Sequence, residues 1–109
     1  MSTFSQYNET VSFNDALLVR NISEIFSKIT TSIDSNNSLV IDISEHAEAD
    51  LSFIQLIESA RRQAKAQNKS ITLSSPAKGH VLKVLERAGF LDAFNPDDAK
   101  FWLHKEVTP

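Results

Sequence analysis

Two segments of the chain carry apolar residues at the same helical spacing, and a short apolar run separates them. One stripe starts at Ile22 and the other at Phe53, and in each the apolar residues recur at i, i+3, i+4, i+7 and i+11, the pattern of a helix with one buried face. Between them, residues 39–43 read Leu-Val-Ile-Asp-Ile, which is typical of a strand in a sheet covered by helices. The order helix, strand, helix predicts crossover connections and parallel strands.

Cap and turn residues predict where the remaining elements begin and end. Asn21 is a good N-cap for the first helix, and Glu24 three residues later suggests a capping box. Ser75 followed by Pro76 marks the start of a third helix, and Gly89 marks its end. The expected elements are short strands at 10–13 and 16–19, a helix from 51 to 66, a strand at 70–74, a helix from 76 to 88 and a last helix after Asn95. Alternatively, residues 17–19 lead straight into the first helix.

The alternation of strands and helices predicts a small α/β fold with a largely parallel central sheet, and an amino-terminal hairpin at its edge. A chain of 109 residues that is 41% hydrophobic has the size of one domain that folds without metal or disulfide. We therefore expect a single domain over residues 1–109, with a core at about 11–94 and a C-terminal helical extension at about 95–106.

Composition excludes several classes of function. The net charge of −3 argues against binding to nucleic acid, and the absence of cysteine removes thiolate zinc sites and cysteine nucleophiles. Three histidines without an i, i+4 partner and two glycines predict no metal site and no phosphate-binding loop. Because residues 1–7 lack a signal-peptide pattern, we expect a cytoplasmic protein with no membrane insertion, no cofactor and no catalytic residues.

Four segments follow one another along the chain, namely Leu39-Val-Ile-Asp-Ile-Ser44, Asp50-Leu-Ser52, Ser70-Ile-Thr-Leu-Ser-Ser-Pro76 and Val81-Leu-Lys-Val-Leu-Glu-Arg-Ala-Gly-Phe90. In this order they resemble the STAS family, the domain shared by sulphate transporters and anti-sigma factor antagonists. The resemblance spans residues 11–94, nearly the whole chain. It implies a small STAS-like α/β fold with a mixed, mostly parallel central sheet of about four strands and helices mainly on one face.

The start of the second helix departs from the pattern of the antagonists. In those proteins a partner kinase phosphorylates the first serine of an Asp-Ser-Ser or Asp-Ser-Thr motif, whereas the matching triplet here is Asp50-Leu51-Ser52. Leu51 has no hydroxyl, and the usual Gly-Leu that follows is replaced by Phe-Ile. Ser52 is therefore the candidate phosphoacceptor. We favour a capping role for it, either in a capping box with Gln55 or behind an Asp50 cap.

Residues around this helix start are the predicted partner contacts. On a helical wheel, Leu51 points away from the buried face and Ile54 lies on its flank, beside the polar Gln55 and Glu58. Two apolar residues at the place where the family docks its partners predict a contact patch, with Leu51 as the principal contact. The predicted partner-binding residues are Glu48, Asp50, Leu51, Ser52, Ile54, Gln55 and Glu58.

Charge is distributed unevenly along this region. Four acids fall between positions 42 and 50 without a base, and four cations fall between positions 61 and 69. The interpretation we favour is a helix whose charges match its dipole, and the alternative is an acidic loop that steers a basic partner.

The resemblance implies a non-enzymatic interaction module that regulates a bacterial signalling kinase, without the usual serine switch. The expected partner is an ATP-binding kinase or a histidine-kinase-type regulator. The alternative is an accessory STAS subunit of a lipid-transport ABC system, bound to its ATPase. Small-ligand binding and the oligomeric state stay open.

Overall fold

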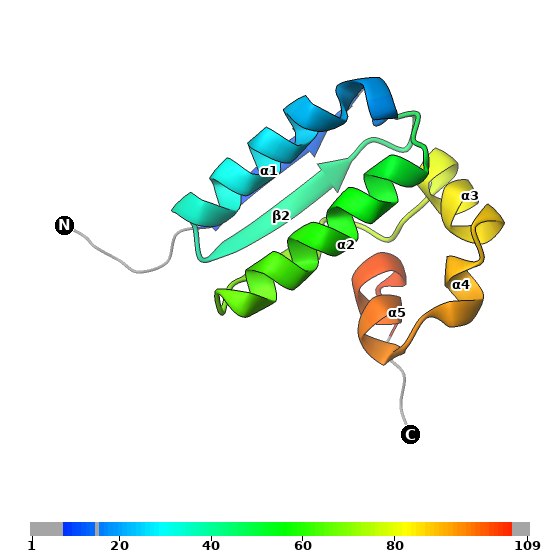
Figure 1. Cartoon of the computed structure of the whole chain (residues 1–109). Coiled ribbons are helices and arrows are strands. Elements are labelled where there is room, and N and C mark those ends of the chain that lie inside the picture. The colour runs from blue at the N-terminus through cyan, green and yellow to red at the C-terminus, as the bar shows by residue number, and fades with distance from the viewer. Residues whose placement is uncertain (1–7, 15, 106–109) are drawn as a thin grey trace.

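The computed structural model describes residues 8–14 and 16–105 (Figure 1). Three parallel strands form its sheet in the order β1-β2-β3, with Val11 beside Ile41 and Leu39 beside Ile71. The strands are β1 (Asn8–Phe13), β2 (Ser38–Ile43) and β3 (Ser70–Leu73). The helices are a 3₁₀ turn η1 (Val19–Asn21), α1 (Ile22–Ser35), α2 (Leu51–Ala66), α3 (Gly79–Arg87), α4 (Phe90–Ala93) and α5 (Pro96–Leu103).

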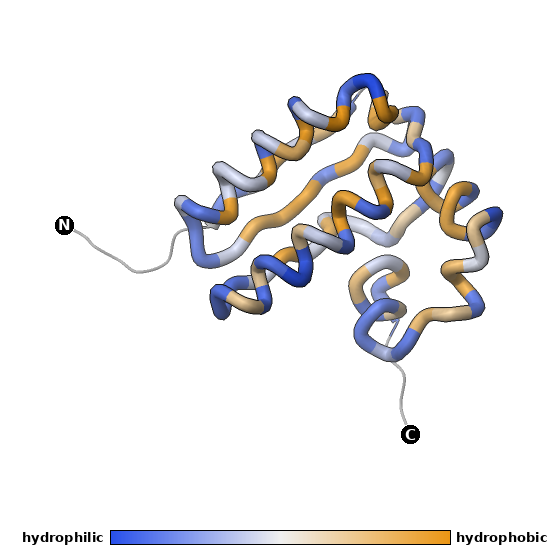
Figure 2. Tube along the Cα trace, in the orientation of Figure 1, coloured by the Kyte–Doolittle hydropathy of each residue, from blue (hydrophilic) through white to orange (hydrophobic). Residues whose placement is uncertain are grey.

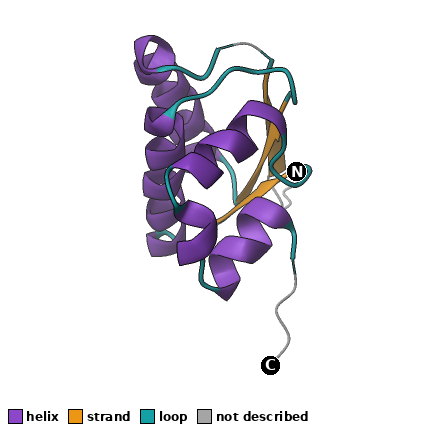
Figure 3. Ribbon diagram, turned by 90° about the vertical axis from the view of Figure 1, so that its right-hand side faces the viewer, coloured by secondary structure: helices purple, strands orange, loops and turns teal. Residues whose placement is uncertain are grey.

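Helices α1 and α2 cover one face of the sheet, as Figures 1 and 3 show from two directions. The side chains of Leu39 and Ile41 point into this layer and are buried, and Figure 2 shows β2 as a mainly hydrophobic strand in the middle of the sheet. The other face is polar, because Asp42 lies there and accepts hydrogen bonds from Ser74 (2.6 Å) and Ser12 (3.4 Å). The expected α/β architecture with helices mainly on one face is confirmed.

The expected amino-terminal hairpin is wrong. Residues 16–19 form no strand; instead Leu17 makes an isolated parallel bridge with Ala49, and the chain passes through η1 directly into α1. Leu17 is fully buried, so this side chain enters the core and the segment does not pair back on β1. The described sheet consequently has three strands, where about four were expected.

Two further local predictions are wrong. Helix α3 begins at Gly79 and not at Pro76, because the Ala77 N–H donates to the Trp102 carbonyl (2.7 Å) and holds this stretch against α5. The capping box at the start of α1 does not form, since the Asn21 side chain makes no cap hydrogen bond. The C-terminal side of α3 is as expected, with Gly89 in the left-handed region at φ 79°.

The core continues into the C-terminal segment. Trp102 is fully buried and Phe101 is nearly so, and both belong to the same hydrophobic cluster as Phe53 and Leu85. Helix α5 starts with a complete capping box between Asn95 and Asp98. The two aromatic residues of α5 are therefore part of the main core.

The apolar stripe of α1 is narrower than its spacing predicts. Ile25, Ile29 and Ile33 are buried, whereas Phe26 is 48% exposed. Ile25, Ile29 and Ile33, spaced four residues apart, already form the buried face of the helix. Phe26 therefore falls at the margin of the apolar stripe.

Candidate functional site at the start of α2

Asp50 holds the start of α2 and the segment before α1 together. Its Oδ1 accepts from the Ser52 N–H (3.1 Å) and from the Ser52 hydroxyl, so it is the N-cap of α2. Its Oδ2 accepts from the Val19 N–H (2.9 Å). The backbone repeats this connection, because the Asp50 N–H donates to the Leu17 carbonyl (3.2 Å). One carboxylate therefore fixes two chain segments whose residues lie about thirty positions apart.

These hydrogen bonds determine the ionisation of Asp50. Burial alone raises the pKa of this carboxyl, but the hydrogen bonds from the Ser52 hydroxyl and from the N–H groups of Val19, Ser52 and Phe53 outweigh it and lower the pKa below its ordinary value of 3.8. The positive end of a helix also favours a carboxylate. Asp50 is therefore a charged structural cap, consistent with the commoner role that the sequence suggests.

Leu51 is the exposed apolar residue that the helical wheel predicts. It is the first residue of α2, and 42% of its surface is open to solvent. Val19, which the sequence did not single out, is 66% exposed and is linked to the same Asp50 carboxylate. Leu51 and Val19 lie on either side of Asp50. Together with the exposed Glu48 and Gln55 they define what we call the α2-start surface.

Ser52 is less available than a phosphoacceptor in a free loop. Its hydroxyl donates to Asp50 Oδ1, and its side chain is only partly exposed at the second position of the helix. Of the two capping interpretations, the position behind an Asp50 cap is the one observed, and no capping box with Gln55 forms at this helix start.

The predicted position of Ile54 is wrong. Ile54 is fully buried in the hydrophobic cluster, so we remove it from the set of candidate contacts. The single-stripe wheel misses this burial because α2 contacts α1 on one side and α3 on the other. The buried arc of α2 is consequently wider than the face that meets the sheet.

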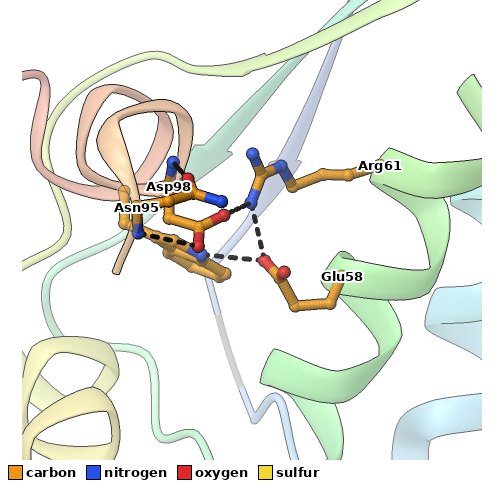
Figure 4. Close-up of polar contacts among 5 residues, drawn as sticks. Glu58, Arg61, Asn95 and Asp98 are labelled. Carbon is orange, nitrogen blue, oxygen red and sulfur yellow. Dashed lines mark hydrogen bonds and ion pairs between the residues drawn. The ribbon is translucent and has the colours of Figure 1, made fainter. Parts of the chain in front are cut away.

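Glu58 is occupied inside the molecule. Its Oε2 accepts from Arg61 Nη1 (2.9 Å) and from Trp102 Nε1 (3.0 Å), and the same Arg61 atom pairs with Asp98 Oδ1 (3.0 Å) (Figure 4). The Arg61 guanidinium also lies over the Phe101 ring, 4.4 Å from its centre. These contacts attach α5 to α2, so we assign Glu58 a structural role instead of a partner contact.

The loop before α2 is held on both sides. The Leu17 N–H donates to the Glu48 carbonyl (2.6 Å), and Gly79 packs directly against the Glu45 backbone. The side chains of Glu45 and Glu48 remain exposed. An acidic and partly apolar surface on a fixed frame can bind a protein without a large ordering cost.

The described residues contain neither a metal-ligand cluster nor a membrane-spanning helix. Within residues 8–14 and 16–105, no three histidine, aspartate or glutamate side chains converge as metal ligands would. No helix in the described part of the chain is both long enough and apolar enough to cross a bilayer.

A family model described as "Mlab, STAS domain" matches residues 6–94. The chain belongs to the STAS domain family. No curated protein and no solved structure matches it. The STAS match spans β1 to α4 and includes the whole α2-start surface. As a STAS domain, the chain is a regulatory or interaction module, in agreement with the resemblance carried by its four segments.

Proposed function

We propose that this STAS domain is a non-enzymatic cytoplasmic module that regulates a bacterial signalling kinase by docking through the α2-start surface. The observation that carries the proposal is the exposure of Leu51 and Val19 on either side of the Asp50 anchor. Exposed apolar residues surrounded by polar ones are typical of protein contacts. Glu48 and Gln55 supply that polar rim.

Binding of this kind does not need the usual phosphorylation switch. Leu51 carries no hydroxyl, and the Ser52 hydroxyl is engaged with Asp50. A phosphate on Ser52 would place close to two negative charges next to the Asp50 carboxylate. We therefore propose a module that is always competent to bind, with Ser52 as a cap.

The same observation also supports a second candidate. A surface that is always competent suits a constitutive subunit, and the alternative partner is the ATPase of a lipid-transport ABC system. In both cases the docking residues are those of the α2-start surface. The two candidates differ in the partner and not in the surface.

The test combines capture of the partner with one substitution. The tagged protein is used to retain partners from its own cells at low salt, where electrostatic contacts are weakly screened, and mass spectrometry identifies them. We expect Leu51→Glu to weaken binding of the captured partner by about tenfold or more. The substitution should not unfold the protein, because a carboxylate in the first turn suits the positive end of a helix.

Ser59→Glu is the matched control. It adds the same charge on an exposed position of the same helix, two turns away, and should leave affinity unchanged. Capture of a signalling kinase supports the first candidate, and capture of a transporter ATPase supports the second. If Leu51→Glu and Ser59→Glu both bind the captured partner as tightly as the unmodified protein does, the docking surface is wrongly assigned.

A further inference from the structure

A second surface lies at the other end of α2, where an open cleft of about 830 Å³ separates the C-terminal half of this helix from β3 and α5. Its floor is the edge of β3 together with Phe101, and its walls come from α2 and α5. The residues that line it are Glu58, Arg61, Arg62, Ala64, Lys65, Lys69, Ser70, Ile71, Thr72, Leu73, Asn95, Asp97, Asp98, Lys100, Phe101 and His104.

The cleft is basic although the whole chain is acidic. Five lysine and arginine side chains line it, against three carboxylates, whereas the chain as a whole carries −3. Glu58 and Asp98 are both used by Arg61. Among the described residues, Arg62, Lys65 and Lys100 are exposed and form no ion pair. Their charges are therefore available to a ligand that enters the cleft.

The floor of the cleft is an edge of the sheet. The Ser70 N–H donates to the Asn37 carbonyl (3.2 Å) and the Ser74 N–H to the Ile41 carbonyl (3.0 Å), so these alternate residues bond toward β2. Because the backbone groups of a strand alternate between its two sides, those of Ile71 and Leu73 point toward the cleft. β3 is the last strand in the order β1-β2-β3 of the described sheet. Its outer edge is therefore paired with no other strand of the described sheet.

His104 already occupies one position of this edge. Its Nε2 lies 3.1 Å from the Leu73 carbonyl oxygen, and since a carbonyl only accepts, Nε2 is the donor. The side chain thus takes the place that a backbone N–H of a further strand would have. The N–H groups of Ile71 and Leu73 and the Ile71 carbonyl remain directed into the cleft.

We propose that this cleft binds an acidic segment of a partner protein in extended conformation, which adds as a strand to the edge of β3. Main-chain hydrogen bonds to Ile71 and Leu73 would supply affinity, and the cations on both walls would select acidic side chains. A second copy of the chain is disfavoured as occupant, because two basic clefts would face each other. Nucleic acid is disfavoured by the three carboxylates in the lining and by the net charge of the chain.

The test uses a labelled peptide of about eight residues that alternates glutamate and valine, a length typical of a strand. A peptide that alternates lysine and valine is the charge control. Binding to the full chain is followed by fluorescence anisotropy at low salt, and amide hydrogen exchange is followed by NMR. We expect the acidic peptide alone to bind, and the exchange of the Ile71 and Leu73 amides to slow when it does. The Thr72 amide, which faces β2, should change little.

Charge-reversal variants test whether the cations that line the cleft bind the peptide. The double variant Lys65→Glu, Lys100→Glu should weaken binding of the acidic peptide by about tenfold or more. The matched control Lys83→Glu, Arg87→Glu changes the net charge equally on exposed positions of α3 outside the cleft, and should leave affinity within about twofold. Equal weakening by both double variants would show that only overall charge matters, and would overturn the assignment of the cleft.

The backbone readout separates strand addition from simple charge attraction. Binding without slower exchange at Ile71 and Leu73 would overturn strand addition, and so would equal binding of the two peptides. Leu51→Glu should leave peptide binding unchanged, because Leu51 lies at the opposite end of α2 from the cleft. The outcome for this cleft is therefore independent of the outcome for the α2-start surface.

Discussion

Gly79 offers a direct measure of how tightly the loop before α2 is packed. Its φ of 59° is left-handed, a conformation that favours glycine. A Cβ added there would overlap the Glu45 carbonyl oxygen and lie 3.2 Å from the Glu45 carbonyl carbon. The contact joins the first residue of α3 to the loop that leads into the α2-start surface. Gly79→Ala therefore perturbs backbone conformation and backbone packing together.

The magnitude follows from two contributions. A non-glycine residue in the left-handed region costs about 1–2 kcal/mol, and overpacking against a backbone that must shift costs about 1–3 kcal/mol. We expect Gly79→Ala to lower the free energy of unfolding by about 2–5 kcal/mol. The matched control is Gly89→Ala, where φ is 79° and, apart from the two chain neighbours, no described atom lies within 4 Å of the added Cβ. This control should cost only the conformational contribution, about 1–2 kcal/mol.

Urea unfolding followed by the fluorescence of the single tryptophan, Trp102, measures both variants under the same conditions. The slope of the transition should stay constant, so that the shift of the midpoint reports stability. The informative quantity is the difference between the variants, because it isolates the contact with Glu45. Equal losses of stability for Gly79→Ala and Gly89→Ala would refute the close approach of α3 to the loop.

Four further substitutions test the assignments around α2. Ile54→Ala should lower the free energy of unfolding by about 2–5 kcal/mol, whereas Leu51→Ala should change it by less than about 0.5 kcal/mol; similar values in urea unfolding would contradict the burial of Ile54. Folding lowers the pKa of Asp50, so the ionised carboxylate stabilises the protein at pH values above 3.8, the ordinary pKa of this group. That contribution is lost as the pH falls through the lower folded value, so Asp50→Asn should flatten the acid side of the stability profile. Glu58→Leu removes the acceptor for Trp102 Nε1, so it should cost about 1–3 kcal/mol and shift the emission of Trp102, and an unchanged spectrum would argue against the Glu58–Trp102 hydrogen bond.

Local sequence patterns predict the elements whose cause is local. Helix α2 runs from Leu51 to Ala66 as expected, because its apolar spacing and its Asp50 cap act within a few residues of one another. The left-handed Gly89 at the end of α3 has the same kind of origin. Leu51 belongs to this group as well, since a residue opposite the buried stripe is exposed in most packings.

Other features depend on contacts between segments far apart in the sequence. Helix α3 begins at Gly79 because Ala77 is bonded to Trp102, a partner that no local cap signal includes. Leu17 is buried in the core and bridges to Ala49 instead of pairing with β1, and the expected hairpin is lost. In both cases a non-local hydrogen bond overrides a local preference.

The features of the candidate site also fall into those that local sequence predicts and those that depend on tertiary contacts. The sequence by itself determined the α/β class, the STAS resemblance and the exposure of Leu51, because periodicity and short motifs carry that information. Only the tertiary structure decided that Val19 joins Leu51 beside Asp50, that Ile54 is buried and that Glu58 binds Trp102. The physical reason is that helical spacing specifies which way a side chain points, whereas its neighbours are set by how α2 packs against the rest of the chain.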